Sequence, residues 1–104
     1  AGPDFVINGQ YWELKQVAGI GNGAIEDNIK RGAQNFSADG SPLAASQSPP
    51  RVILDVRGNS RWDDPVALAA ELRRLSSAGN TTMQKVKDVK IITSHGTITL
   101  KGKI

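Results

Sequence analysis

"PDFVINGQYWELK", residues 3–15, is the stretch that decides how this chain begins to fold. Two runs rich in β-branched and aromatic residues flank Asn8-Gly9, a pair typical of the tight turn of a β-hairpin. We therefore predict strands over residues 4–7 and 10–17. Three charged residues, Asp4, Glu13 and Lys15, interrupt these otherwise strand-forming runs, so their placement matters for packing and for chemistry.

A two-residue turn fixes which residues face each other across the hairpin. Asp4 then faces Glu13, and Lys15 lies on the same side because side chains alternate along a strand. The other side carries four apolar residues that we predict to face the core: Phe5, Ile7, Trp12 and Leu14. Directly opposed side chains have Cβ atoms about 4.5–5.5 Å apart, so two opposed carboxylates repel each other. Lys15 or a divalent cation would relieve this repulsion; the alternative is an exposed sheet face with ordinary surface charges.

The rest of the chain predicts strands and helices in the order β-β-α-β-α-β-β. Apolar residues recur at helical spacing over residues 24–36, and Asp64-Pro65 marks the start of a second helix that ends near Gly79. A polar, proline-containing stretch over 37–50 predicts a flexible loop. Three further strands are predicted at 51–56, 89–94 and 97–103, the last two meeting near His95-Gly96. This pattern indicates an α/β fold with a mixed β-sheet flanked by helices.

Length and composition set limits on the protein class. With 104 residues, the chain is predicted to form a single domain, residues 1–104. It contains no cysteine, so a disulfide framework or a thiolate metal site is excluded. No apolar run approaches the roughly 18 residues of a membrane span. The net charge of +3 leans towards an anionic partner, with a solvated surface carrying spare lysines as the favoured alternative. The absence of an initiating Met suggests a fragment of a longer chain or a processed start.

Pro3-Asp4, followed across the hairpin by Glu13-Leu14-Lys15, resembles the signature of the PD-(D/E)XK nuclease superfamily. The wider run, with "IKRGAQ" in the helix and "RVILDVRG" in the next strand, is similar to nuclease domains at the C-termini of contact-dependent growth inhibition toxins and related polymorphic toxins. The resemblance covers most of the chain and implies a restriction-endonuclease-like core. That core usually begins with a helix before the first strand, whereas only Ala1 and Gly2 precede Pro3. The helix would lie upstream, come from a partner, or be missing.

The resemblance implies a metal-dependent endonuclease, with tRNA favoured over other RNA and over DNA as the substrate. Asp4 and Glu13, with the main-chain carbonyl of Leu14, would hold the divalent ion. Mg²⁺ is the first candidate, with Mn²⁺ and Zn²⁺ as alternatives. Lys15 would be the catalytic lysine, and Gln34 would match a helix glutamine that such families place near the site.

The same resemblance implies a biological setting. The domain would be delivered as part of a larger secreted or cell-surface toxin in competition between bacteria. It would act in the cytoplasm of the target cell, and a cognate immunity protein would neutralise it.

Basic and aromatic residues outside the hairpin are candidates for contacts with nucleic acid. Arginine and lysine supply most of the non-specific affinity for phosphate groups. We predict such contacts from Lys30, Arg31, Arg57 and Arg61. Trp62 and Tyr11 are candidates for stacking on bases, whereas Arg73 and Arg74 are predicted to form a solvated helix face.

Other patterns support rival interpretations. Gly19, Gly21 and Ala24 satisfy a relaxed dinucleotide-binding fingerprint, with a flexible turn as the alternative. His95, the only histidine, would suit the general base of a metal-independent ribonuclease or an exposed turn. A binding module without catalysis is the remaining function class.

Three aspartates remain to be placed. Asp55 interrupts an apolar strand, so we predict a salt bridge at the end of the sheet or an approach to the site. Asp63 and Asp64 are predicted to cap the second helix.

Overall fold

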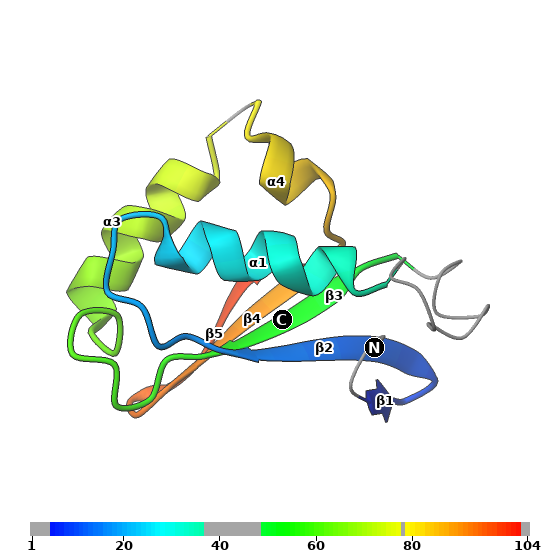
Figure 1. The fold of residues 1–104 in the computed structure, drawn as a ribbon, viewed down its shortest axis with the longest axis horizontal. Coiled ribbons are helices and arrows are strands. Elements are labelled where there is room, and N and C mark those ends of the chain that lie inside the picture. Colours follow the sequence, from blue (N-terminus) through cyan, green and yellow to red (C-terminus); the bar gives the residue numbers. More distant parts are fainter. Residues whose placement is uncertain (1–4, 37–48, 78, 103–104) are drawn as a thin grey trace.

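The computed structural model describes residues 5–36, 49–77 and 79–102, which form a mixed five-stranded sheet with three helices on one of its faces (Figure 1). The elements follow one another as β1 (Phe5–Ile7), β2 (Gln10–Gln16), α1 (Ala24–Gln34), β3 (Arg51–Asp55), α3 (Pro65–Leu75), α4 (Thr81–Gln84), β4 (Asp88–Thr93) and β5 (Gly96–Lys101). The predicted α/β class and element order are confirmed, except that the short helix α4 was not predicted. Most of the predicted loop, residues 37–48, lies outside the described residues.

The strands lie in the sheet in their sequence order, β1-β2-β3-β4-β5. The three central strands are parallel, and an antiparallel strand pairs with each side of this trio. Each parallel connection contains helix: α1 joins β2 to β3, and α3 with α4 joins β3 to β4. None of the helices in the described part of the chain is long and apolar enough to span a bilayer.

The hairpin β1-β2 has the predicted register. Phe5 pairs with Trp12 and Ile7 with Gln10. Asn8 and Gly9 have φ values of 51° and 77°, the left-handed backbone that a tight hairpin turn requires at both central positions. The next predicted pair along the hairpin is Asp4 with Glu13, and Asp4 lies outside the described residues.

The hydrophobic core lies between the sheet and the helices. Strand β4 alternates buried and half-buried positions, because only one of its faces lies under helices. Helix α1 contributes Ile25 and Ile29 to the core, and α3 contributes Leu68 and Leu75. The sheet side of the same cluster consists of Val17, Val52, Leu54, Val56, Val89 and Ile91. Full burial of such side chains stabilises the fold by about 1.5–3 kcal/mol each.

The predicted orientation of β2 is wrong. Glu13 is 2% exposed, whereas Leu14 and Ile7, both predicted to face the core, are 40% and 41% exposed. The cause is the parallel pairing of β2 with β3, which sets Glu13 beside Val52 and Lys15 beside Leu54 on the face covered by α1. Trp12 is buried as predicted, but it lies on the opposite face. The side chain of Phe5 is not among those described.

Helix α1 approaches the sheet closely at Gly32. A methyl group built at this position would lie 2.9 Å from both Cγ atoms of Val52 and 3.5 Å from Cγ of Glu13. Because real Cβ atoms essentially never come that close to another carbon, glycine is needed for this packing distance. The close approach brings the last turn of α1 directly over Glu13.

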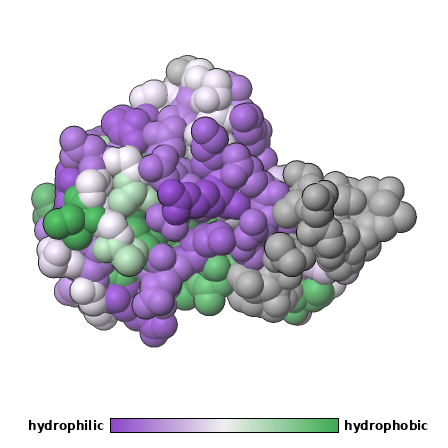
Figure 2. All heavy atoms as spheres, viewed as in Figure 1, coloured by the Kyte–Doolittle hydropathy of each residue, from purple (hydrophilic) through white to green (hydrophobic). Residues whose placement is uncertain are grey.

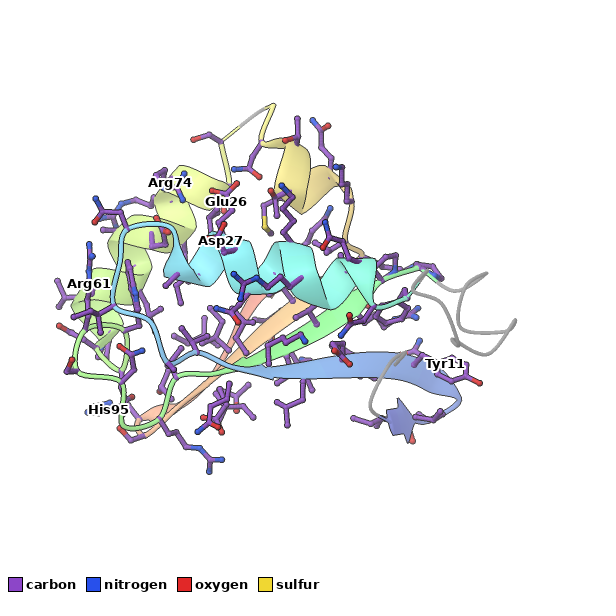
Figure 3. All side chains as sticks on the ribbon, in the orientation of Figure 1. Tyr11, Glu26, Asp27, Arg61, Arg74 and His95 are labelled. Atoms are coloured by element: carbon purple, nitrogen blue, oxygen red, sulfur yellow. The ribbon has the colours of Figure 1, made fainter. Side chains whose placement is uncertain are left out.

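Ion pairs join the helices to one another. Arg74 on α3 donates to Glu71 on the same helix and to Glu26 on α1, at 2.7 and 2.9 Å (Figure 3). The pKa of Glu26 is lowered, mainly by the hydrogen bond from Arg74. Arg74 is exposed, as predicted for a solvated helix face, and it also links the two helices, which was not predicted.

Two adjacent aspartates have different roles at the start of α3. Asp64 accepts a hydrogen bond from the backbone N–H of Val66 and caps the helix as predicted. Asp63 does not cap it. Its carboxylate accepts hydrogen bonds from the backbone N–H and the hydroxyl of Ser94 and from the backbone N–H of Gly58. Asp63 therefore ties the β3-α3 connection to the β4-β5 turn.

We expect Asp63 to make part of the stability dependent on acid. The hydrogen bonds from Ser94 lower the pKa of Asp63 from 3.8 to about 2. A lowered folded-state pKa stabilises the fold at pH values above 3.8, and this contribution is lost as the pH falls towards 2. Asp63→Asn should lower the melting temperature at pH 7 and reduce its fall between pH 4 and pH 2.

Asp64→Asn is the matched control, because asparagine caps helices about as well as aspartate. Thermal unfolding monitored by circular dichroism, repeated across this pH range, compares the two variants. Identical pH profiles for both variants would show that Asp63 does not carry the effect.

Candidate functional site

Glu13 is a charged residue whose side chain is buried between the sheet and helix α1. It is 2% exposed and lies on the helix-covered face of β2, between Val52 and the backbone of Gly32. A carboxylate removed from water must be paired or hydrogen-bonded, because desolvation strongly disfavours its charged form. The neighbouring side chains meet this requirement.

Lys15 provides the positive charge at the site. Its Nζ lies 3.2 Å from Oε2 of Glu13, and its side chain remains 29% exposed. The two residues are separated by one position on the strand, so both project towards α1. The pair therefore joins a buried carboxylate to an ammonium group that solvent can reach.

Asn35, at the C-terminal cap of α1, is the polar residue that completes the cluster. Its side-chain amide donates to Oε2 of Glu13, the same oxygen that Lys15 approaches. The sequence analysis missed Asn35. The signal that would have found it is its position three residues after Gly32, one turn along the face of α1 that meets β2.

Gln34, predicted to lie near the site, faces elsewhere. It is exposed and lines a pocket of about 230 Å³ together with Lys30 and Lys85. Since neighbouring helix positions point about 100° apart, Gln34 and Asn35 belong to different flanks of α1. The predicted contact Lys30 lies on the Gln34 flank, between α1 and α4.

Arg31 lies on the other flank of α1. It lines a pocket with Asn28, Asp27 and the glycines of the β2-α1 loop. Asn28, Arg31 and Asn35 follow one another at spacings of three and four residues, so they form one stripe along the helix. Of the four predicted nucleic-acid contacts, Arg31 is the one on the stripe that also carries Asn35.

The other two predicted contacts hold the structure together at the opposite end of the sheet from the hairpin. Figure 3 shows Arg61 beside the β2-α1 loop, remote from Tyr11. Arg61 donates to the carbonyl of Ile20 and to Asn22, at 2.8 and 2.7 Å. Arg57 makes a two-pronged ion pair with Asp55, which confirms the predicted salt bridge and lowers the pKa of Asp55.

Two further candidates are excluded from the site by their positions. Trp62 is 3% exposed and has the guanidinium of Arg61 4.4 Å from its ring centroid, so it offers no free face to a base. His95 is exposed in the β4-β5 turn, at the end of the sheet opposite Tyr11 (Figure 3). The exposed-turn interpretation of His95 is confirmed, and His95 cannot serve as a base for chemistry at Glu13.

The glycine-rich loop lies between β2 and α1, where a dinucleotide fingerprint would place it. Its backbone is already bound by side chains of the β3-α3 connection. Asn59 donates to the carbonyls of Val17 and Gly19, and Arg61 to that of Ile20. The structure thus gives this loop an internal role in joining two connections.

The described residues include two of the three oxygen donors predicted for a divalent ion. None of them belongs to a cluster of three or more His, Cys, Asp or Glu side chains able to hold a metal ion. These two donors are Glu13, which lies on the helix-covered face of β2, and Leu14, the next residue of the strand. The third predicted donor, Asp4, falls outside the described residues.

Comparison of the chain with protein-family models, with curated proteins and with solved structures finds no match.

Proposed function

We propose that this chain is a metal-dependent endonuclease with a restriction-endonuclease-like core, and that its substrate is RNA, with tRNA the first candidate. The observation that carries the proposal is the cluster of Glu13, Lys15 and Asn35. A buried carboxylate and a solvent-reaching lysine, two positions apart on β2, match the spacing of the sequence signature.

Each residue of the proposed site has a defined task. Glu13 and Asp4, with the carbonyl of Leu14, would hold a divalent ion. When bound, such an ion supplies charge neutralisation at the phosphate and lowers the pKa of a water molecule. The hydrogen bond from Asn35 fixes the orientation of the Glu13 carboxylate. A fixed carboxylate needs no rearrangement when the substrate arrives.

Lys15 is suited to contact the substrate. An ammonium group has three donors, and only part of its capacity is used by Glu13. Because the side chain is 29% exposed, the remaining donors can reach a phosphate oxygen that approaches from solvent. Arg31, on the stripe of α1 that carries Asn35, would bind a neighbouring phosphate through its planar guanidinium.

The biological setting belongs to the same proposal and is supported by the sequence resemblance. The domain would be carried by a larger toxin, delivered to a neighbouring cell and active in its cytoplasm. A cognate immunity protein would protect the producing cell. The net charge of +3 is compatible with a polyanionic substrate.

Removal of the divalent ion should abolish cleavage. The purified chain would be incubated with total tRNA and, separately, with plasmid DNA, in Mg²⁺, Mn²⁺, Zn²⁺ or chelator. We expect cleavage of tRNA with at least one ion and none in chelator, followed on denaturing gels. Cleavage that survives chelation would contradict the metal-dependent proposal, and cleavage of plasmid DNA alone would assign a DNase of the same fold.

A binding module without catalysis is the second candidate function. The observation that favours it is the Glu13–Lys15 ion pair, which neutralises the buried carboxylate without any ion. On this alternative the chain would bind tRNA equally well in Mg²⁺ and in chelator and would leave it intact under every condition.

A further inference from the structure

A group of basic residues lies at the edge of the sheet where β3 and β4 begin. Strands β3 and β4 are parallel and begin side by side, with Arg51 paired to Asp88 in the sheet register. Among the described residues, five basic ones lie at or near this edge: Lys30, Arg51, Lys85, Lys87 and Lys90. We call this group the cationic edge. Two pockets lie along it, one formed with the helices and one on the uncovered face of the sheet.

The pocket beside the helices is lined by donors. Lys30 from α1 and Lys85 from the end of α4 contribute ammonium groups, and Gln34 adds an amide. No carboxylate lines this pocket among the described residues. Its volume of about 230 Å³ exceeds what one phosphate group fills. Figure 2 shows the hydrophilic surface over α1 and α4.

The pocket on the uncovered face is larger and also basic. It has a volume of about 420 Å³, and the described residues that line it carry three cations against one carboxylate, Asp88. Arg51 pairs with Asp88 at 3.0 Å, so no further carboxylate among the described lining residues balances the charges of Lys87 and Lys90. Trp12 is only 6% exposed, so it offers an edge and no stacking face. The basic groups therefore set the chemistry of the ligand.

One short segment connects the two pockets. Lys85 lines the helix-side pocket and Lys87, two residues later, lines the pocket on the uncovered face. The backbone N–H of Lys87 donates to the carbonyl of Pro50 at 2.7 Å, which fixes this segment to the start of β3. The same segment thus presents lysines to both sides of the edge.

We propose that the cationic edge is a binding track for the phosphate backbone of a single nucleic-acid strand, which passes from one pocket to the other around Lys85 and Lys87. The proposal deepens the proposed function and rests on it for the choice of a nucleic acid. Separate pockets that each combine lysines with neutral donors fit successive phosphate groups. Lysine acts at such sites as a point charge on the phosphate oxygens and requires no particular base sequence.

Binding of a short unstructured RNA tests the track. Fluorescence anisotropy would be measured in chelator, so that the result is independent of cleavage. We expect Lys85→Gln and Lys87→Gln each to weaken binding by about fivefold and to lower the slope of log affinity against log salt by about 0.7. Arg73→Gln removes the same charge from an exposed position on α3 and should weaken binding less than about twofold.

Three outcomes would overturn the track. One is a failure of the wild-type chain to bind RNA at low salt. Another is an equal weakening of binding in all three variants, which would show general attraction without a preferred path. The third is competition by polyglutamate as strong as that by RNA for the edge lysines, which would assign the surface to an acidic protein. A chain that binds RNA along the edge but never cleaves it would refute the proposed catalysis while leaving the track intact.

Discussion

Glu13→Gln is expected to lower the rate of RNA cleavage by about a hundred- to a thousandfold while leaving the fold intact. Glutamine has nearly the shape of glutamate, and its carbonyl oxygen can still accept the hydrogen bond from Asn35. The substitution removes the negative charge that would bind a divalent ion and pair with Lys15. Single-turnover cleavage of tRNA in the preferred ion, beside circular dichroism of both proteins, measures the two effects separately.

Glu26→Gln is the matched control, because it makes the same chemical change on the helix that covers the site. Glu26 is 27% exposed and pairs with Arg74, so its loss should affect the contact between helices and leave cleavage within about twofold. Equal losses of cleavage in the two variants would refute a special role for Glu13.

A Lys15→Met variant, alone and combined with Glu13→Gln, separates the effect of the Glu13–Lys15 pair on cleavage from its effect on the stability of the fold. Loss of the lysine leaves the buried carboxylate with Asn35 but without its cation. Removing one partner of a buried pair is destabilising, whereas removing both partners often is not. The double variant with Glu13→Gln should therefore regain stability and remain without activity, and recovery of activity would contradict the proposed site.

The sequence was most informative where local chemistry decides the structure. Asn8-Gly9 predicts a turn with positive φ at both positions, and the observed register of β1 with β2 follows from it. Asp64-Pro65 likewise marks the start of α3. Which face of the hairpin is buried depends instead on β3 and α1, which are distant in sequence. The prediction from the apolar residues of the hairpin therefore placed the wrong face of β2 against the helices.

The same limit applies to the candidate site. Glu13 and Lys15 could be placed on one face from their spacing alone, and the structure shows them 3.2 Å apart. Which residue at the end of α1 contacts Glu13, Gln34 or Asn35, depends on the rotation of the helix about its axis, and the sequence analysis considered only Gln34. That rotation is set by the contact of Gly32 with Val52, a packing detail that no motif contains.

Gly32→Ala is expected to lower the free energy of unfolding by about 1–3 kcal/mol, because an added methyl group overpacks the contact between α1 and β3. Both Cγ atoms of Val52 would lie 2.9 Å from the new carbon, and a β-branched side chain has little freedom to turn away. Alanine favours a helix over glycine by up to about 1 kcal/mol, which opposes this loss without cancelling it. Urea unfolding measures the net change.

Val52→Ala, combined with Gly32→Ala in a double variant, tests this explanation. It removes the two methyl groups that the new carbon meets, so the double variant should be more stable than the sum of the single effects predicts. Gly21→Ala is the control, because nothing lies within 4 Å of a methyl group at that position. If Gly32→Ala proves as harmless as Gly21→Ala, α1 can move away from the sheet at little cost. The contact of Asn35 with Glu13 would then depend on something other than the close packing at Gly32.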